Sequence, residues 1–291
     1  MLRLGVLGNI DSWYVADLTR AAVSRGHQCE RLDFPRLTGA CGPGLSPVRQ
    51  GAVDLLDFDA VLVRTMPPGS LEQVVLRMDL LHQLLTLGVK VINPPRALEC
   101  AVDKYLTTAK LSQAGLPVPQ TIVCEQFEEA MAAFEQLGGD VVVKPIFGAE
   151  GRGIVRVSDP DLAHRVFRTL ERVNSALYLQ KFVPHPGYDI RVLILGDRIL
   201  GSMKRISDTD FRTNVSRDAR TELHVTTDAE LKAARQAVDC TGAIFAGVDL
   251  LYDQNGELYV IEVNAVPGWR AFGRTTGIDV ATELIRWLEE H

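Results

Sequence analysis

Two short apolar runs near the C-terminal end, residues 246–252 and 258–264, constrain the fold of this chain more than its other stretches do. Both runs are rich in branched apolar residues, and the segment between them contains Asn255-Gly256, a strong turn signal. The pattern predicts an antiparallel hairpin that belongs to a sheet with at least one buried face.

The hairpin carries a carboxylate in each strand, Asp249 in the first and Glu262 in the second. Because side chains alternate along a strand, Glu262 and Asn264 face the same way, and pairing can place Asp249 beside them. Burying ionised carboxylates is costly without a partner, and two neighbouring carboxylates repel each other. The three groups predict a site for a hard divalent cation, Mg²⁺ or Mn²⁺, shared with nucleotide phosphates. The alternative is a self-satisfied polar network inside the core.

Composition indicates a soluble globular protein, long enough at 291 residues for two or three subdomains. No apolar run approaches a membrane span, and the N-terminus lacks the layout of a signal peptide. The five cysteines are scattered without a C-x-x-C pair, which favours a reducing cytoplasm. The formal charge of −6 and the lack of a basic stripe argue against nucleic acid. We expect a cytoplasmic homo-oligomer with no nucleic-acid or membrane partner.

Residues 1–95 alternate between strand-like and helix-like stretches. Strand-like residues 2–7, 60–64 and 89–93 are separated by helical patterns at 13–24 and 71–85, whereas residues 38–51 predict a surface loop rich in Gly and Pro. Such alternation predicts a small parallel α/β subdomain. No G-x-G-x-x-G follows the first strand, which argues against a dinucleotide site.

Residues 96–180 form the second predicted subdomain, in which a glycine-rich loop follows a buried strand. A run of three valines ends in Lys144, and residues 148–153 include Gly148, Gly151 and Gly153. Glycines let the backbone approach a ligand closely, so its amide groups can contact phosphate oxygens. The spacing is not a Walker A loop, and a glycine-rich loop alone is more typical of a plain hairpin than of a ligand site. Lys144 favours phosphate binding, because a lysine leaving an apolar strand must reach an anion or the surface.

Residues 181–291 form the third predicted subdomain and contain further candidate cations. Residues 188–195 and 198–205 predict an antiparallel pair that carries Arg191 and Lys204, and residues 208–217 predict a polar loop with Arg212 and Asn214. Taken singly, each of these cations is more typical of a solvated surface than of a ligand site.

The order and spacing of six motifs resemble ATP-grasp ligases, specifically the RimK-type ligases that add glutamate to a carboxylate. The motifs are Asp103-Lys104, Val142-Val143-Lys144-Pro145 with the glycine loop, Tyr188-Asp189-Ile190-Arg191, Phe211-Arg212-Thr213-Asn214, Ala246-Gly247-Val248-Asp249 and Ile261-Glu262-Val263-Asn264. The likeness is clear from about Lys90 onward and looser before it. It implies an α/β ATP-grasp fold, with the N-terminal subdomain before two ATP-grasp lobes that divide at residues 180 and 181.

The resemblance implies three groups of site residues. The nucleotide is bound by Lys104, Lys144, the loop residues Gly148, Glu150, Gly151 and Gly153, the backbone of Lys181, Phe182 and Val183, and by Asp189 and Lys204. The metal is bound by Asp249, Glu262 and Asn264. The transferred phosphate and the acyl intermediate lie near Arg191, Arg212 and Asn214. Two departures stand out: Lys181 occupies a position where relatives often have Glu, and the segment before Asp189 is shorter.

The resemblance also implies the reaction. The acceptor carboxylate attacks the γ-phosphate of ATP and forms an acyl phosphate and ADP, and the amino group of glutamate then displaces phosphate. Both steps build negative charge on oxygen atoms, which Mg²⁺ and the cationic side chains stabilise. A regulatory protein that binds a nucleotide without turnover is the alternative from another class.

The acceptor is the part that the resemblance leaves open. Arg64, Trp269 and Arg270 stand where the acceptor is expected to enter, although Trp269 is equally typical of a core residue and Arg270 of a surface charge. We expect a small acceptor, such as a cofactor of the methanopterin or methanofuran type, because no basic docking patch is visible. A protein C-terminus or a carrier protein is the alternative.

Overall fold

The computed structural model describes residues 1–148, 151–213 and 219–291, and its N-terminal part is a four-stranded parallel sheet. The strands lie in the order β2-β1-β6-β7, with the bounds β1 (Arg3–Leu7), β2 (Gln28–Leu32), β6 (Ala60–Val63) and β7 (Lys90–Ile92). The connecting helices are α1 (Trp13–Ser24) and α2 (Leu71–Thr86). Their starts are fixed by the side chains of Ser12 and Ser70, which accept hydrogen bonds from the first turn. The predicted parallel sheet is confirmed.

The segment 38–51, predicted as a surface loop, contains two short strands. A small antiparallel sheet is formed by β3 (Leu37–Gly39), β4 (Val48–Gln50) and β5 (Val53–Asp54). The loop prediction was wrong here, because the glycines and prolines gather at 42–47 while Leu37 and Val48 on either side are buried.

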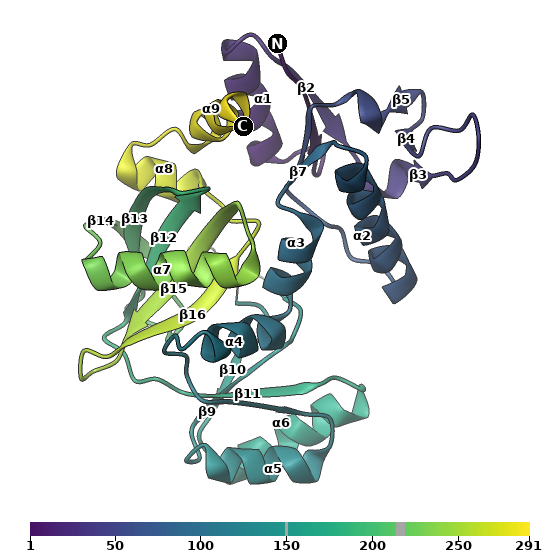
Figure 1. The fold of residues 1–291 in the computed structure, drawn as a ribbon. Coiled ribbons are helices and arrows are strands. Elements are labelled where there is room, and N and C mark those ends of the chain that lie inside the picture. Colours follow the sequence, from purple (N-terminus) through teal and green to yellow (C-terminus); the bar gives the residue numbers. More distant parts are fainter. Residues whose placement is uncertain (149–150, 214–218) are drawn as a thin grey trace.

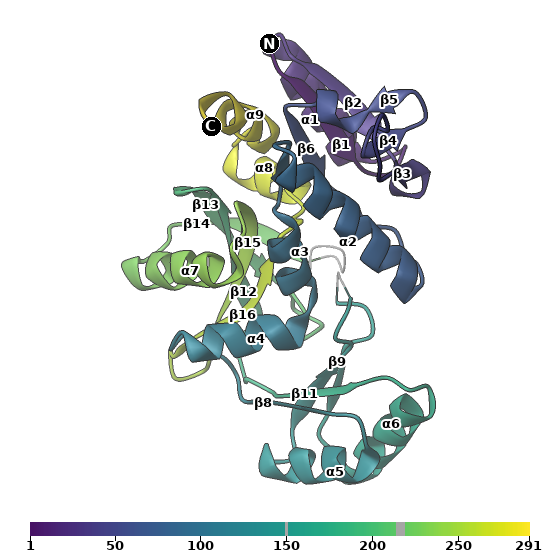
Figure 2. The same cartoon turned by 45° about the vertical axis from the view of Figure 1, so that its right-hand side comes forward.

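Two helices connect the N-terminal sheet to a central lobe. They are α3 (Pro95–Val102), which the sequence patterns did not predict, and α4 (Lys104–Gln113). Asp103 begins α4 by accepting a hydrogen bond from the backbone N of Leu106 at 2.9 Å. Figure 2 shows both helices on the path between the N-terminal sheet and the central lobe.

The central lobe is a four-stranded antiparallel sheet covered on one face by two helices (Figure 1). Its strands lie in the order β10-β9-β11-β8, with the bounds β8 (Thr121–Cys124), β9 (Val141–Lys144), β10 (Val155–Val157) and β11 (Leu177–Lys181). The helices are α5 (Phe127–Gln136) and α6 (Pro160–Arg172). Phe134 and Phe167 meet edge to face in an apolar cluster whose members all belong to this lobe.

The third part is a five-stranded antiparallel sheet in the order β14-β13-β12-β15-β16. Its elements are β12 (Tyr188–Leu195), β13 (Arg198–Ile206), β14 (Arg220–His224), α7 (Asp228–Thr241), β15 (Phe245–Tyr252) and β16 (Leu258–Asn264). The hairpin predicted at 246–264 is confirmed as β15 and β16, with Asp249 opposite Glu262 and Gly247 opposite Asn264. Two further helices, α8 (Arg270–Thr276) and α9 (Val280–Glu290), complete the chain.

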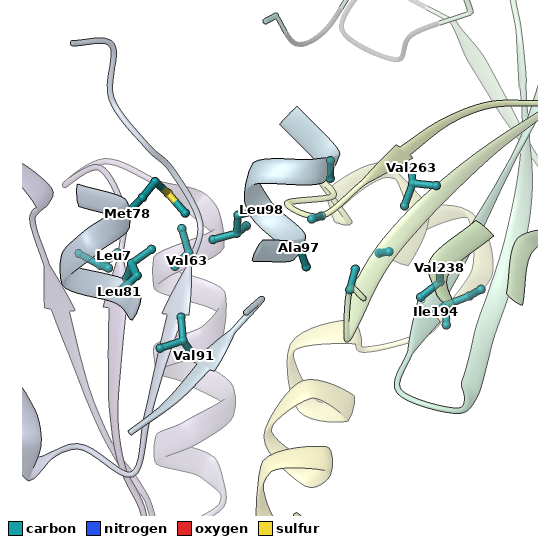
Figure 3. Packing of buried hydrophobic residues seen from close by; sticks show 14 of the residues in the cluster. Leu7, Val63, Met78, Leu81, Val91, Ala97, Leu98, Ile194, Val238 and Val263 are labelled. Carbon is teal, nitrogen blue, oxygen red and sulfur yellow. The ribbon is translucent and has the colours of Figure 1, made fainter. Parts of the chain in front are cut away.

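The N-terminal sheet and the third part share their apolar cores. Figure 3 shows Leu98 and Ala97 of α3 between Val63 and Leu81 on one side and Val263 on the other. A second cluster joins Leu18 of α1 to Leu284 of α9, so both ends of the chain lie together (Figure 1). Within the described ranges, no helix combines the length and the apolar character needed to cross a membrane.

Candidate active site

A cleft of about 1110 Å³, partly open to solvent, lies between the central lobe and the five-stranded sheet. The predicted site residues that line it are Lys104, Lys144, Gly148, Gly151, Lys181, Phe182, Val183, Asp189, Arg212, Asp249 and Glu262. They come from six separate segments of the chain, and the fold brings them together around one space.

Lys144, the last residue of β9, is held in this cleft by a chain of polar side chains. Its Nζ donates to Oε1 of Gln180 at 2.6 Å, and Nε2 of Gln180 donates to Oγ1 of Thr121 at 3.0 Å and to the Tyr178 hydroxyl at 3.2 Å. Because an ammonium group only donates, the orientation of the Gln180 amide is fixed. The sequence reasoning missed Gln180, although its place before the predicted adenine strand, in register with the lysine strand, is a usable signal.

Burial lowers the pKa of Lys144 to about 8, against the attraction of Glu262 and Asp249, and nearby Lys104 lowers it further. A lysine in this state is poised between a cation and a free amine near neutral pH. A bound anion next to it would favour the cation.

Lys104 and the glycine loop close the other side of the cleft. Nζ of Lys104 donates to the carbonyl oxygen of Gly148 at 2.6 Å. Gly151 and Gly153 have φ angles of 69° and 73°, a conformation that suits glycine. Gly153 does not line the cleft itself, and Glu150 lies outside the described residues.

The predicted adenine segment follows directly from β11. The backbone N of Lys181 donates to Gln120 O at 2.8 Å, and that of Phe182 donates to Asp140 O at 2.9 Å. In the described part of the chain, the backbone N of Val183 has no such partner, so it can donate to a ligand. The Phe182 ring is fixed by the Arg156 guanidinium 3.6 Å from its centroid.

The floor of the cleft is a network of two carboxylates and two guanidinium groups. Arg191 donates from Nε and Nη2 to the Asp249 carboxylate, with Nη2 and Oδ2 2.8 Å apart. Arg205 donates from Nε to Asp189 at 2.7 Å, and its Nη2 also lies 2.8 Å from Asp249 Oδ2. Oγ1 of Thr213 donates to Asp189 at 2.5 Å. The expectation of a repelling carboxylate pair at Asp249 was therefore wrong, because two guanidinium groups compensate its charge.

The two carboxyls of this network differ in their electrostatics. Burial raises the pKa of Asp249, but Arg191 and Arg205 outweigh burial and hold that pKa below its usual value. For Asp189, burial exceeds the effect of Arg205, so its pKa is raised. Asp249 thus remains ionised, and Asp189 depends on Arg205 and Thr213 for its charge.

Arg205 lines the cleft and was not among the predicted site residues, whereas its predicted neighbour Lys204 does not line it. Neighbouring side chains on a strand face opposite ways, so only one of the two can line the cleft. Arg205 lines it, whereas Nζ of Lys204 lies 4.6 Å from the centroid of the Tyr188 ring. The pairing of Asp189 with Arg205 across β12 and β13 is the signal that points to Arg205.

The donor chemistry of the hairpin fits a hard cation only together with other oxygen atoms. Glu262 lines the cleft, Asp249 is engaged by arginines, and Oδ1 of Asn264 accepts from the backbone N of Val266 at 2.9 Å. In the described ranges, no three His, Cys, Asp or Glu side chains gather as a metal site. Two carboxylates and an amide oxygen leave positions that phosphate oxygens would fill, as Mg²⁺ prefers.

The remaining predicted residues lie around the cleft. Nη1 of Arg212 donates to Ile154 O at 3.1 Å and its Nη2 lies 2.7 Å from Asp210 Oδ2, which ties the two lobes together. Arg191 does not itself line the cleft but orients Asp249 from behind. Asn214 lies outside the described residues.

The three predicted substrate residues lie at the junction of the N-terminal sheet and α8. Trp269 is buried, and its Nε1 donates to Asp17 at 2.8 Å, so the core interpretation describes its position. Arg270 is exposed, with its guanidinium 5.5 Å from the Trp13 ring centroid. Arg64 is buried and stacks on Trp269 at 4.4 Å.

A family model described as the RimK-like ATP-grasp domain matches residues 101–288. The chain belongs to this family, and it is an ATP-dependent ligase that forms amide bonds. It is 29% identical to the tetrahydromethanopterin:alpha-L-glutamate ligase of Methanosarcina acetivorans, over 99% of both chains. It is also 31% identical to the ribosomal protein bS6–L-glutamate ligase of Escherichia fergusonii, over 94% of this chain and 91% of the other.

A solved structure shares the fold. The ATP-grasp ligase PsnB, complexed with a minimal precursor, Mg and ADP, has a TM-score of 0.76 at 21% identity. The alignment covers 99% of this chain and 97% of that one. The predicted ATP-grasp fold is therefore confirmed.

Proposed function

We propose that this ligase adds L-glutamate to the carboxylate of an acceptor through an acyl phosphate. The observation that carries the proposal is the set of Lys104, Lys144, Arg205 and Glu262 around one cleft. Its cations match the charges of a triphosphate, and the relatives named above are glutamate ligases.

In the first step, an oxygen atom of the acceptor carboxylate attacks the γ-phosphorus of ATP, and the bond to the β,γ-bridging oxygen breaks to release ADP. Lys144 and Lys104 hold the phosphates, and Val183 N donates to the adenine edge. Glu262 and Asp249 would hold Mg²⁺, which would neutralise charge on the phosphate oxygens. Mn²⁺ has the same oxygen preference and is expected to substitute.

In the second step, the glutamate nitrogen attacks the acyl carbon, loses a proton, and inorganic phosphate leaves with the carbon–oxygen bond. Arg205 and Arg212 lie where they can stabilise the developing oxyanion. Exclusion of water by the glycine loop protects the acyl phosphate from hydrolysis. No protein nucleophile is required.

We further propose that the acceptor is a small cofactor carboxylate of the tetrahydromethanopterin type. Alignment over the full length of the methanogen ligase supports this choice, as does the acidic formal charge of −6. The bS6 relative supplies the alternative, a protein C-terminus. Glu150, Asn214 and Gly153 complete the proposed site, and Lys204 contributes positive charge behind it.

The experiment is incubation of purified protein with ATP, Mg²⁺, L-glutamate and candidate acceptors, followed by mass spectrometry and measurement of ADP. Glutamylation of a pterin-type acceptor with acceptor-dependent ADP release supports the proposal. Glutamylation of a protein C-terminus alone would assign the alternative acceptor, and ADP release with another amino acid only would refute glutamate.

Self-association and a cytoplasmic location complete the proposal. Leu71, Val75 and Leu76 are exposed on α2, which gives that helix an apolar surface suited to a second copy. All five cysteines are free, as a reducing compartment favours. A solution mass equal to one chain would refute self-association.

A further inference from the structure

Arg64, at the carboxyl end of β6, is a buried cation without a carboxylate partner among the described residues. Its side chain is 8% exposed, its Nη2 donates to Pro267 O at 2.7 Å, and its buried Nε makes no hydrogen bond. The guanidinium stacks on Trp269 at 4.4 Å and on Tyr14 at 5.1 Å. The two aromatic faces and the Pro267 carbonyl oxygen carry only partial negative charge, so they do not neutralise the Arg64 cation.

Such a group is costly for the fold. Burial lowers the pKa of Arg64 to about 10, with Tyr14 opposing the change, because the desolvated cation lacks compensation. Among the other arginines buried in the described residues, Arg191 and Arg205 are paired with carboxylates, whereas Arg77 on α2 donates to Pro67 O at 2.6 Å. A buried charge that a protein retains unpaired fits a ligand of opposite charge.

The position of Arg64 is that of a ligand site in an open α/β sheet. It follows β6, next to the carboxyl end of β1. The chain continues from β1 to β2 on one side of this point and from β6 to β7 on the other, so the order of the strands reverses between β1 and β6. Ligands bind at this switch point, outside the carboxyl ends of the strands. The carboxyl ends of these strands face the third part of the chain, because Arg64 at the end of β6 donates a hydrogen bond to Pro267.

A continuous path of contacts leads from Arg64 to the reaction site. Pro267, which accepts from Arg64, follows β16 within five residues of Glu262. A Cβ atom built on Gly247 would lie 3.1 Å from Pro267 Cβ and 2.9 Å from Arg191 Nη1. Pro267 therefore lies between Arg64, which donates to its carbonyl oxygen, and Gly247, beside which the Arg191 side chain passes.

We propose that Arg64 binds a carboxylate group of one of the two organic substrates, either L-glutamate or the acceptor. The proposal rests on the ligase function proposed above and assigns a substrate subsite within it. Trp269 and Tyr14 hold the guanidinium in place, so these aromatic residues act as positioning residues.

The competing role is a clamp that joins the N-terminal sheet to the tail of β16. The two roles predict different effects of removing the Arg64 charge on the stability of the free protein. Removal of a clamp destabilises the free protein, whereas removal of an uncompensated buried cation leaves stability unchanged or raises it. Arg64→Met keeps the apolar stem against Trp269, and Arg64→Lys keeps the charge without the planar fork.

The test measures thermal unfolding without ligands, ATP binding, and calorimetric binding of L-glutamate to full-length wild type, Arg64→Met and Arg64→Lys. We expect Arg64→Met to unfold no earlier than wild type and to bind ATP normally. We expect its Kd for L-glutamate, or its KM for the acceptor found by mass spectrometry, to rise about 10- to 100-fold. Arg64→Lys should give a smaller rise.

The affected ligand distinguishes the two sources of the carboxylate. A raised Kd for L-glutamate alone assigns the amino-acid subsite, and a raised acceptor KM alone assigns the acceptor subsite. Earlier unfolding of Arg64→Met with both affinities within twofold of wild type would overturn the proposal in favour of a clamp. Loss of L-glutamate binding in Arg64→Met would support the subsite even if no acceptor is glutamylated. Failure of the subsite proposal can therefore be told apart from failure of the proposed function. Arg165→Ala, an exposed arginine on α6 away from the cleft, serves as the arginine control.

Discussion

At the scale of single residues, Gly247 shows how one missing side chain makes room for the guanidinium group that orients Asp249. A Cβ atom there would lie 2.9 Å from both Cδ and Nη1 of Arg191. Arg191 can reach Asp249 only because its side chain passes over this bare stretch of β15. Position 247 therefore requires glycine because a side chain would collide with Arg191, and not because of its backbone conformation.

Gly247→Ala is therefore expected to displace Arg191 from Asp249. We expect a loss of about 1–3 kcal/mol in unfolding free energy from overpacking, together with at least a tenfold fall in kcat/KM. Denaturant unfolding and steady-state kinetics measure the two effects. Unchanged turnover in a folded Gly247→Ala protein would show that the Arg191–Asp249 contact is dispensable.

Lys144 gives a prediction about pH. The free protein holds the Lys144 proton only up to about pH 8, whereas an unfolded chain holds it to about 10.5. Since phosphate binding needs the cation, the Kd for ATP should rise above pH 8, approaching tenfold per pH unit. The stability of the free protein changes in the opposite direction. Between pH 8 and 10.5 the unfolded chain holds the Lys144 proton and the folded protein does not, so the free energy of unfolding rises with pH over this range.

The measurement is ATP affinity between pH 6.5 and 9.5 for wild type and Lys144→Met. Lys144→Met should bind ATP weakly, and the part of the pH dependence due to Lys144 should disappear. The same pH dependence in both proteins would exclude Lys144 as the titrating group.

At the scale of elements, the β15–β16 hairpin carries two carboxylates that face each other but have different partners. Asp249 is paired with Arg191 and Arg205, while Glu262 lines the cleft with no ion pair in the described part of the chain. Charge removal should therefore have different structural consequences at the two positions.

Asp249→Asn should destabilise the protein by about 3–5 kcal/mol, because it leaves two buried guanidinium groups with less compensation. Glu262→Gln should leave stability within about 0.5 kcal/mol. Both variants should lose ligation if the carboxylates bind Mg²⁺ as proposed. Thermal unfolding and ADP release are measured in parallel, and equal stability of the two variants would contradict the paired state of Asp249.

The elements that could be predicted from sequence are those with a strong period or a clear cap. The β15–β16 hairpin, α1 and the strand before Lys144 were all recognised, because buried β-branched runs and Ser12 leave local signals. α8 was not predicted, since its seven residues include Gly273 and two threonines and its helix forms by packing Phe272 into the core.

The site residues, like the elements, were predictable from the sequence only where a local motif marks them. Motif order identified Lys144, Asp249 and Glu262 as neighbours, but no local pattern states which carboxylate pairs with which arginine. The Arg205 pairing depends on the register of β12 with β13 and on its distance from β15. These pairings depend on the tertiary structure, and they show that the negative charge of Asp249 is compensated by two arginines.

At the scale of the whole molecule, the apolar cores divide the chain unequally. The central lobe has its own cluster, while the N-terminal sheet and the third part share two others. The central lobe should therefore move as a unit against the rest, with residues near Lys181 and Lys104 as the connections.

Nucleotide binding across the cleft should restrict this motion. We expect amide exchange of Gly151, Gly153 and Val183 to slow at least fivefold with ADP and Mg²⁺, while amides inside β9 and β11 change little. Hydrogen exchange followed by mass spectrometry measures both sets. Equal exchange at the glycine loop with and without nucleotide would identify it as a rigid hairpin.

The packing of α9 against α1 also affects how the chain is made. Leu18 and Ala22 of α1 are buried with Leu284 and Leu288, and Arg25 contacts Glu289 at 2.5 Å. A ribosome that adds about 5–20 residues per second needs roughly 13–50 s to travel from one helix to the other. During that interval α1 can pack on its own sheet through Leu4 and Val6, but the part of its apolar face that meets Leu284 and Leu288 lacks its native partner. The N-terminal sheet is therefore expected to expose apolar surface, as chaperone substrates do, until α9 has been synthesised.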